Sequence, residues 1–233
     1  MEQMPSNTPV TESKPGPAGW VQTWIMAVTK PNEQTFIEIS ESPDAKVQTA
    51  LIWAVIAGLI SGIMLGIGFA IQSLIQGGGS SNDMGTIALL ICGMPIAMAI
   101  INPIGLSFST ALFQWVAKLF GGVGSFEKLI YPLSAITLPI TIVSGIFSLL
   151  SSIPIVGVCI SFFSFAISIY ATALNIMAVK AVNRFDWGKA IGSVLIPAFA
   201  IGIFCGCVVF IGLMILGPAI ANTFNQINQG LVP

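Results

Sequence analysis

The chain has 233 residues, of which 55% are hydrophobic and 7% are charged. Soluble domains carry about 25% charged residues, so this composition excludes a solvated surface and requires lipid as the surrounding solvent. The net charge of −1 gives no indication of nucleic-acid binding, and the absence of histidine argues against metal sites and general-base catalysis. We therefore expect an all-α, polytopic membrane protein with no cofactor.

The N-terminal part precedes the first apolar run and divides into two segments. Residues 1–17 are polar and rich in proline, which predicts a disordered tail. In residues 18–46, Trp20 and Trp24 share one helical face that suits the headgroup zone, and Asn32 is a candidate N-cap for a second short helix. We expect two short amphipathic interfacial helices there, with a loosely structured lead-in as the alternative.

Five apolar runs follow, and each has the length of about 20 residues that a membrane span needs. Together they predict a five-helix transmembrane domain over residues 47–221, followed by an external tail over 222–233. The last four residues of that tail resemble the remnant of a protease-site tag. The expected spans run from about Val47 to Ile75, within Gly85–Ala117, and from about Leu129 to Leu150, Pro154 to Val179 and Ala190 to Ala221.

The second run contains Pro95 and Asn102-Pro103, yet it is too short for two spans. We expect one kinked, tilted helix or a helix with a short non-helical break. With five spans, all eight Lys and Arg residues fall on one side of the membrane. The positive-inside rule then predicts a cytoplasmic N-terminus and an external C-terminus.

Small residues recur every fourth position along the first span, at Ala54, Gly58, Gly62, Gly66 and Ala70. Such a stripe lets a second helix approach closely, which is how helices associate within lipid. The pattern predicts helix packing at Gly58, Gly62 and Gly66. The sequence leaves open whether the partner helix lies in the same chain or in another subunit of an oligomer.

Polar and small side chains follow helical periodicity along the fourth span. One interpretation is the lining of a water-filled path or of a groove for lipid headgroups. The other is hydrogen bonding and close packing between helices. The candidate lining residues are Ser161, Ser164, Ser168, Thr172 and Asn175.

No ionisable residue lies deep in any expected span. Proton-coupled carriers, pumps and voltage sensors place such groups there, so the pattern argues against these classes. A nucleophile–base pair or a metal-binding set is also missing from the sequence, and we therefore expect no enzyme.

The stretch from Ala111 to Pro139 resembles the core of the Yip family, the Ypt/Rab-interacting membrane proteins, in its prokaryotic branch. Lys30–Phe36, Tyr170–Val182 and Trp187–Ala190 extend the resemblance, which covers roughly residues 20–221. Its most specific part is the loop motif of Gly121, Gly122, Gly124, Ser125 and Phe126.

The resemblance implies five helices with a cytoplasmic N-terminus in a prokaryotic cell membrane. Eukaryotic members bind Rab GTPases and act in vesicle traffic and membrane shaping, often as hetero-oligomers. This chain lacks their Asp-Leu-x-Gly-Pro motif, which argues against a Rab partner. We expect a non-enzymatic membrane protein that organises membranes through lipids, helix–helix contacts or partner proteins. The alternative is a channel or uncoupled transporter for a small neutral solute.

Overall fold

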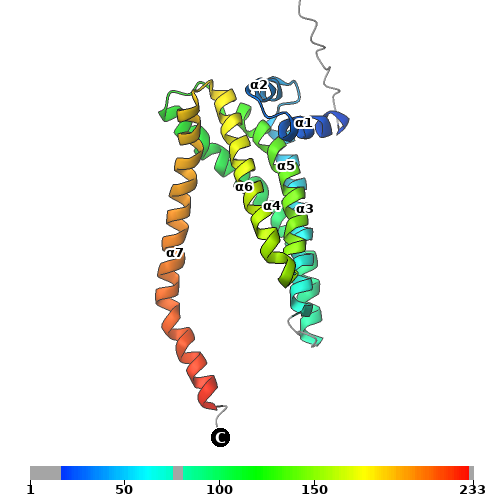
Figure 1. Cartoon of the computed structure of the whole chain (residues 1–233), viewed down its shortest axis with the longest axis vertical. Helices are drawn as coiled ribbons and strands as arrows, with labels where there is room; N and C mark the ends of the chain where they lie inside the picture. Colours follow the sequence, from blue (N-terminus) through cyan, green and yellow to red (C-terminus); the bar gives the residue numbers. More distant parts are fainter. Residues whose placement is uncertain (1–16, 76–80, 231–233) are drawn as a thin grey trace, which may run out of the picture.

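The computed structural model describes residues 17–75 and 81–230, and its regular elements there are all α-helices (Figure 1). The tail predicted over residues 1–17 lies outside the described residues apart from Pro17, as do residues 231–233 of the C-terminal tail. The helices are α1 (Pro17–Thr29), α2 (Glu33–Glu41), α3 (Val47–Ile75), α4 (Ser81–Leu119), α5 (Phe126–Ser151), α6 (Pro154–Asn183) and α7 (Trp187–Gly230).

Five of these helices, α3 to α7, are long and apolar enough to cross a membrane. The predicted fold class, a polytopic bundle preceded by short helices, is therefore confirmed. Several helix ends differ from the prediction. Helix α5 begins at Phe126 and α7 at Trp187, both before the expected starts, and α6 continues beyond Val179 to Asn183. The second span continues two residues beyond Ala117, and the last helix continues beyond Ala221 to Gly230. Residues 222–229 contain no Gly or Pro, so nothing in the sequence stops the helix before Gly230.

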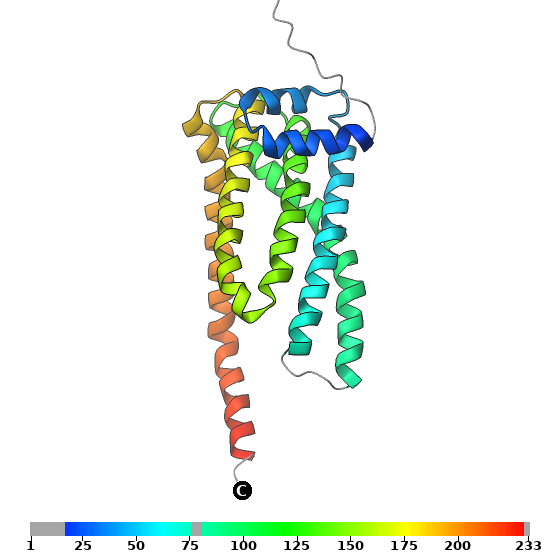
Figure 2. The same ribbon diagram turned by 45° about the vertical axis from the view of Figure 1, so that its right-hand side comes forward.

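The bundle is built around α3, which packs against α4 and α5, while α6 packs on the other side of α5. Helices α1 and α2 lie across one end of the bundle (Figure 2). The α4–α5 loop and the α6–α7 turn lie at that same end (Figures 1 and 2). All Lys and Arg residues of the described part belong to these segments or to the adjoining helix ends. We call this end the charged end.

An aromatic cluster joins α1 to the bundle. Trp53 of α3 is fully buried and lies edge-on to Trp20 and Trp24, at ring-centroid distances of 5.9 and 5.4 Å. It also contacts the buried Tyr131 of α5 at 4.7 Å. The two α1 tryptophans therefore face the protein core, although the sequence pattern had indicated the headgroup zone. The same apolar face can be buried by protein or by lipid, and here Trp53 provides the protein surface.

Helix α4 is continuous from Ser81 to Leu119 with Pro95 and Pro103 inside it, so the expected alternative of a non-helical break is wrong. Its first half runs beside α3, and its second half passes behind the bundle toward α7 (Figure 2). The bend follows the loss of backbone hydrogen bonds at the two prolines.

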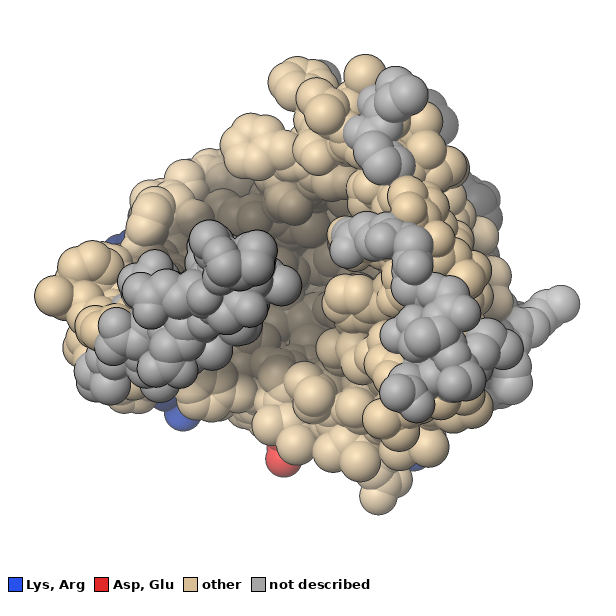
Figure 3. Space-filling view, turned by 90° about the horizontal axis from the view of Figure 1, so that it is seen from below, with Lys and Arg blue, Asp and Glu red and all other residues tan. Residues whose placement is uncertain are grey.

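Helix α7 packs on α4 and α6 through its first part, where Ala190, Ser193, Val194 and Pro197 are buried. Every residue from 198 to 211 is exposed. Seen from the end opposite the charged end, the molecule is hollowed, and the visible walls of the hollow show no Lys, Arg, Asp or Glu among the described residues (Figure 3). This part of α7 is therefore not covered by any other described helix of the chain.

Candidate functional site

The glycine stripe of α3 packs against the backbone of α4 in the same chain. A Cβ atom added at Gly62 would lie 2.5 Å from the Cα atom of Pro95, and one at Gly66 would lie 2.8 Å from the carbonyl oxygen of Leu90. At Gly58 it would overlap the carbonyl group of Met98. Only glycine allows this approach at three successive turns, and the stripe is thus occupied by a helix of its own chain.

Local hydrogen bonds hold the loop motif between α4 and α5 at both of its ends. Gly121 has a φ of +86°, a conformation that favours glycine, and its position follows the last turn of α4. The N–H of Gly122 donates to the carbonyl oxygen of Ala117 at 2.9 Å. Ser125 is the N-cap of α5 and accepts from the N–H of Lys128 at 3.3 Å, while Phe126 begins that helix.

A buried pair of amide side chains fastens this loop to the bundle. Asn183 at the end of α6 accepts from the N–H of Gly124 at 3.1 Å and from Nε2 of Gln114 at 3.0 Å. Gln114 on α4 also donates to the carbonyl oxygen of Gly124 at 2.7 Å. Asn183 in turn donates to Oε1 of Gln114 at 3.3 Å and to the carbonyl oxygen of Val179 at 3.1 Å. We call Gln114, Asn183 and Gly124 the amide lock.

The amide lock explains the spacing of the glycines in the motif. An added Cβ at Gly122 or Gly124 would lie 2.5 or 2.7 Å from Oδ1 of Asn183. The sequence pattern gave no indication of Gln114 or Asn183, because each is a single polar residue separated from the other by 69 positions. A polar residue at the end of an apolar span, next to a turn, is the one local signal that could have pointed to them.

The lock presents an apolar surface at the charged end. Leu119, Val123 and Trp187 expose 67%, 74% and 53% of their surface. They stand among basic residues, since Lys118, Lys128, Arg184 and Lys189 belong to the same loop and turn. We call Leu119, Val123 and Trp187 the apolar rim.

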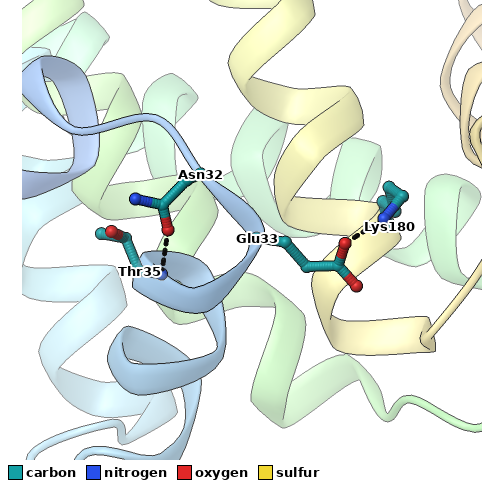
Figure 4. A network of polar contacts seen from close by, with 4 residues as sticks. All are labelled: Asn32, Glu33, Thr35 and Lys180. Atoms are coloured by element: carbon teal, nitrogen blue, oxygen red, sulfur yellow. Dashed lines mark hydrogen bonds and ion pairs between the residues drawn. The ribbon is translucent and has the colours of Figure 1, made fainter.

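Helix α2 packs on the bundle through the buried side chains of Phe36 and Ile39, and polar contacts hold its N-terminus (Figure 4). Asn32 caps the helix by accepting from the N–H of Thr35 at 2.7 Å, which confirms the predicted N-cap. Glu33 pairs with Lys180 of α6, whose side chain is 13% exposed and also lies 5.3 Å from the ring centroid of Trp187. One lysine thus connects α2, α6 and the start of α7.

The polar stripe of α6 uses its hydroxyl groups within its own helix. Each donates to the carbonyl oxygen four residues earlier, at distances of 2.8 Å for Ser161, 3.1 Å for Ser164, 3.0 Å for Ser168 and 2.8 Å for Thr172. Asn175 is half-buried. Among the described residues, these hydroxyl groups therefore make no hydrogen bonds between helices. They also give no specific support to a solute path.

The aromatic cluster contains two unpaired donors. The indole N–H groups of Trp24 and Trp53 are buried and have no hydrogen-bond partner among the described residues. Leaving a buried donor unpaired costs about 1–3 kcal/mol. The packing of the four rings must offset that cost, so the cluster contributes to holding α1 on the bundle.

Comparison with protein-family models assigns residues 26–220 to the Yip1 domain. No curated protein sequence and no solved structure matches the chain. The matched range begins within α1 and reaches into α7, so it contains the amide lock, the apolar rim and all five spans.

Proposed function

Because the chain belongs to the Yip1 domain family, we propose that it is a non-enzymatic membrane protein that organises membranes or supports trafficking through its charged end. Lipids and partner proteins are its ligands in this proposal, and no catalytic step is included. We further assign it to the prokaryotic branch and to the cell membrane, on the loop motif and its surroundings between Ala111 and Pro139.

The apolar rim is the observation that carries the proposal. Exposed aliphatic and aromatic side chains outside the hydrocarbon region mark interaction sites, particularly when polar residues surround them. The amide lock holds Val123 in a fixed loop, so the exposure is built into the fold. Basic neighbours add attraction for anionic headgroups or for an acidic segment of a partner.

The orientation of the charged end follows from the same residues. Lys118, Lys128, Lys180, Arg184 and Lys189 lie at one end of the spans. By the positive-inside rule this end, with the N-terminus, faces the cytoplasm, and the C-terminus of α7 lies outside. The partner is then a cytoplasmic protein, a cytoplasmic lipid headgroup or a second membrane protein in a homo- or hetero-oligomer. A Rab-type GTPase is not proposed, since its motif is missing from the chain.

The test is photo-crosslinking in intact cells from a photoreactive amino acid placed at Val123. The matched control is Val158 of α6, which is 78% exposed at the other end of the bundle. The proposal expects discrete protein or lipid adducts from Val123 that are absent from Val158, and that weaken when Trp187 is changed to Ser. Equal, diffuse labelling at both positions would refute a specific role of the charged end.

A further inference from the structure

Two adjoining cavities lie between α3 and α5, in the half of the bundle far from the charged end. Their volumes are about 440 and about 270 Å³, and both are lined by Leu65 and Ser148. The larger reaches the ends of the helices at Gln72 and Ser152. We call the two cavities together the α3–α5 groove.

The groove is closed toward the charged end. Ser61 and Ile140 line its inner part, and one turn further inward Ala57, Leu133 and Ile136 are at most 2% exposed. The groove is therefore blind, with its mouth on the side that the proposed orientation places outside. Such a shape suits a binding site and does not form a path across the membrane.

The hydroxyl groups that line the groove fall into two sets. Ser61, Ser151 and Ser152 donate to carbonyl oxygens of their own helices at 3.0, 2.8 and 3.3 Å. The hydroxyls of Thr141, Ser144 and Ser148 donate to no residue in the part of the chain that the structure describes. Removing a hydroxyl group from water without a compensating hydrogen bond is unfavourable, so these three indicate water or a ligand.

One amide group belongs to the lining, that of Gln72 at the mouth. At the inner end, Asn102 stands behind the lining and donates from Nδ2 to the Ser61 hydroxyl at 3.4 Å. Hydroxyl and amide groups both donate and accept hydrogen bonds. Among the described residues, the lining of the two cavities includes no Asp, Glu, Lys or Arg. A charged ligand would find no counter-charge among them, whereas a neutral compound rich in hydroxyl groups would pair with the hydroxyls of Thr141, Ser144 and Ser148.

We propose that the α3–α5 groove binds a neutral polyhydroxyl group, supplied by a free sugar or by the headgroup of a neutral glycolipid. A cavity of about 440 Å³ lies in the range of about 300–1,000 Å³ that small-ligand sites occupy. Its mouth lies at the helix ends, at Gln72 and Ser152, and its walls belong to two neighbouring helices, so we expect both sources of the group to reach it. It is separate from the apolar rim and goes beyond the proposed function.

The experiment uses the full chain in liposomes, with the native cysteines replaced and one cysteine introduced as Ser144→Cys. Labelling by a charged, membrane-impermeant thiol reagent is followed in three settings. They are phosphatidylcholine alone, phosphatidylcholine with monoglucosyl-diacylglycerol, and phosphatidylcholine with free glucose. Ser168→Cys on the exposed side of α6 is the control.

The proposal expects the thiol reagent to label Ser144→Cys in phosphatidylcholine alone. Either the glycolipid or free glucose should slow this labelling. The labelling rate should fall about threefold when the ligand concentration is twice its Kd. Protection by the glycolipid identifies a headgroup site, and protection by glucose identifies a soluble ligand. Adding Thr141→Val and Ser148→Ala should remove the protection without lowering the thermal stability. Absence of labelling at Ser144→Cys, or labelling that neither sugar slows, would overturn the proposal.

Discussion

At the scale of single residues, the amide lock has the clearest energetic consequence. Changing Asn183 to Leu removes the acceptor of the Gly124 N–H and both hydrogen bonds between Asn183 and Gln114, while Gln114 keeps its bond to the carbonyl oxygen of Gly124. Each buried group left unpaired costs about 1–3 kcal/mol, and one kcal/mol shifts the Tm of a chain this long by about 2–4 °C. We expect Asn183→Leu to lower the Tm in detergent by several degrees.

The control is Asn175→Leu, the same substitution two turns earlier on α6. Asn175 is half-buried, and its side chain bonds to no residue that the structure describes. This variant should keep the Tm of the parent chain. A double change of Gln114 and Asn183 to Leu should cost less than the sum of the single changes, because it removes both ends of the same contact. Strict additivity would contradict the amide lock.

At the scale of helices, the α3–α4 contact predicts a sharp difference between two glycines. Gly62→Ala brings a methyl group within 2.5 Å of the α4 backbone at Pro95, which cannot move without shifting the helix. Overpacking of this kind costs about 1–3 kcal/mol. We expect a lower Tm and faster unfolding in dodecyl sulfate, both measured on the purified protein.

Gly202→Ala on α7 is the matched control, since nothing lies within 4 Å of an added Cβ atom there. It should leave the stability unchanged or slightly raised, as alanine favours helix over glycine by about 1 kcal/mol. If both variants lose stability equally, the loss does not come from the contact between α3 and α4. That result would contradict the close approach of α4 to Gly62.

Helices and caps could be predicted from the sequence because their signals are local. Span lengths follow from continuous apolar runs, the Asn32 cap from its place before α2, and the small-residue stripe from a four-residue repeat. Contacts between distant segments carry no such signal. The amide lock joins residues 69 positions apart, and the α3–α5 groove combines residues of three helices. The packing of Trp24 on Trp53 was missed for a related reason: its helical face was predicted to lie in the headgroup zone, and a protein core accepts the same apolar face.

At the scale of the whole molecule, the distribution of charge fixes an expected orientation. A single cysteine at Val123, in a chain without native cysteines, should react with an impermeant maleimide only after cells are permeabilised. A cysteine at Ile153, which is 44% exposed in the turn between α5 and α6, should react in intact cells. Both should react equally in detergent, which controls for local accessibility. The reverse pattern would invert the topology.

Helix α7 packs on the bundle through its first part, so the rest of its length can act as a lever arm on that contact. The helix is packed against the bundle between Trp187 and Pro197, and Pro197 lacks the N–H that would donate to the carbonyl oxygen of Ser193 in the preceding turn. The stretch from there to Gly230 is about 50 Å long, so a tilt of about 10° at Pro197 displaces its far end by about 9 Å. We expect thinning or bending of the bilayer to tilt this long arm. The tilt would act on the packed start of the helix, beside Trp187 and the Lys180–Glu33 pair that joins α2 to α6.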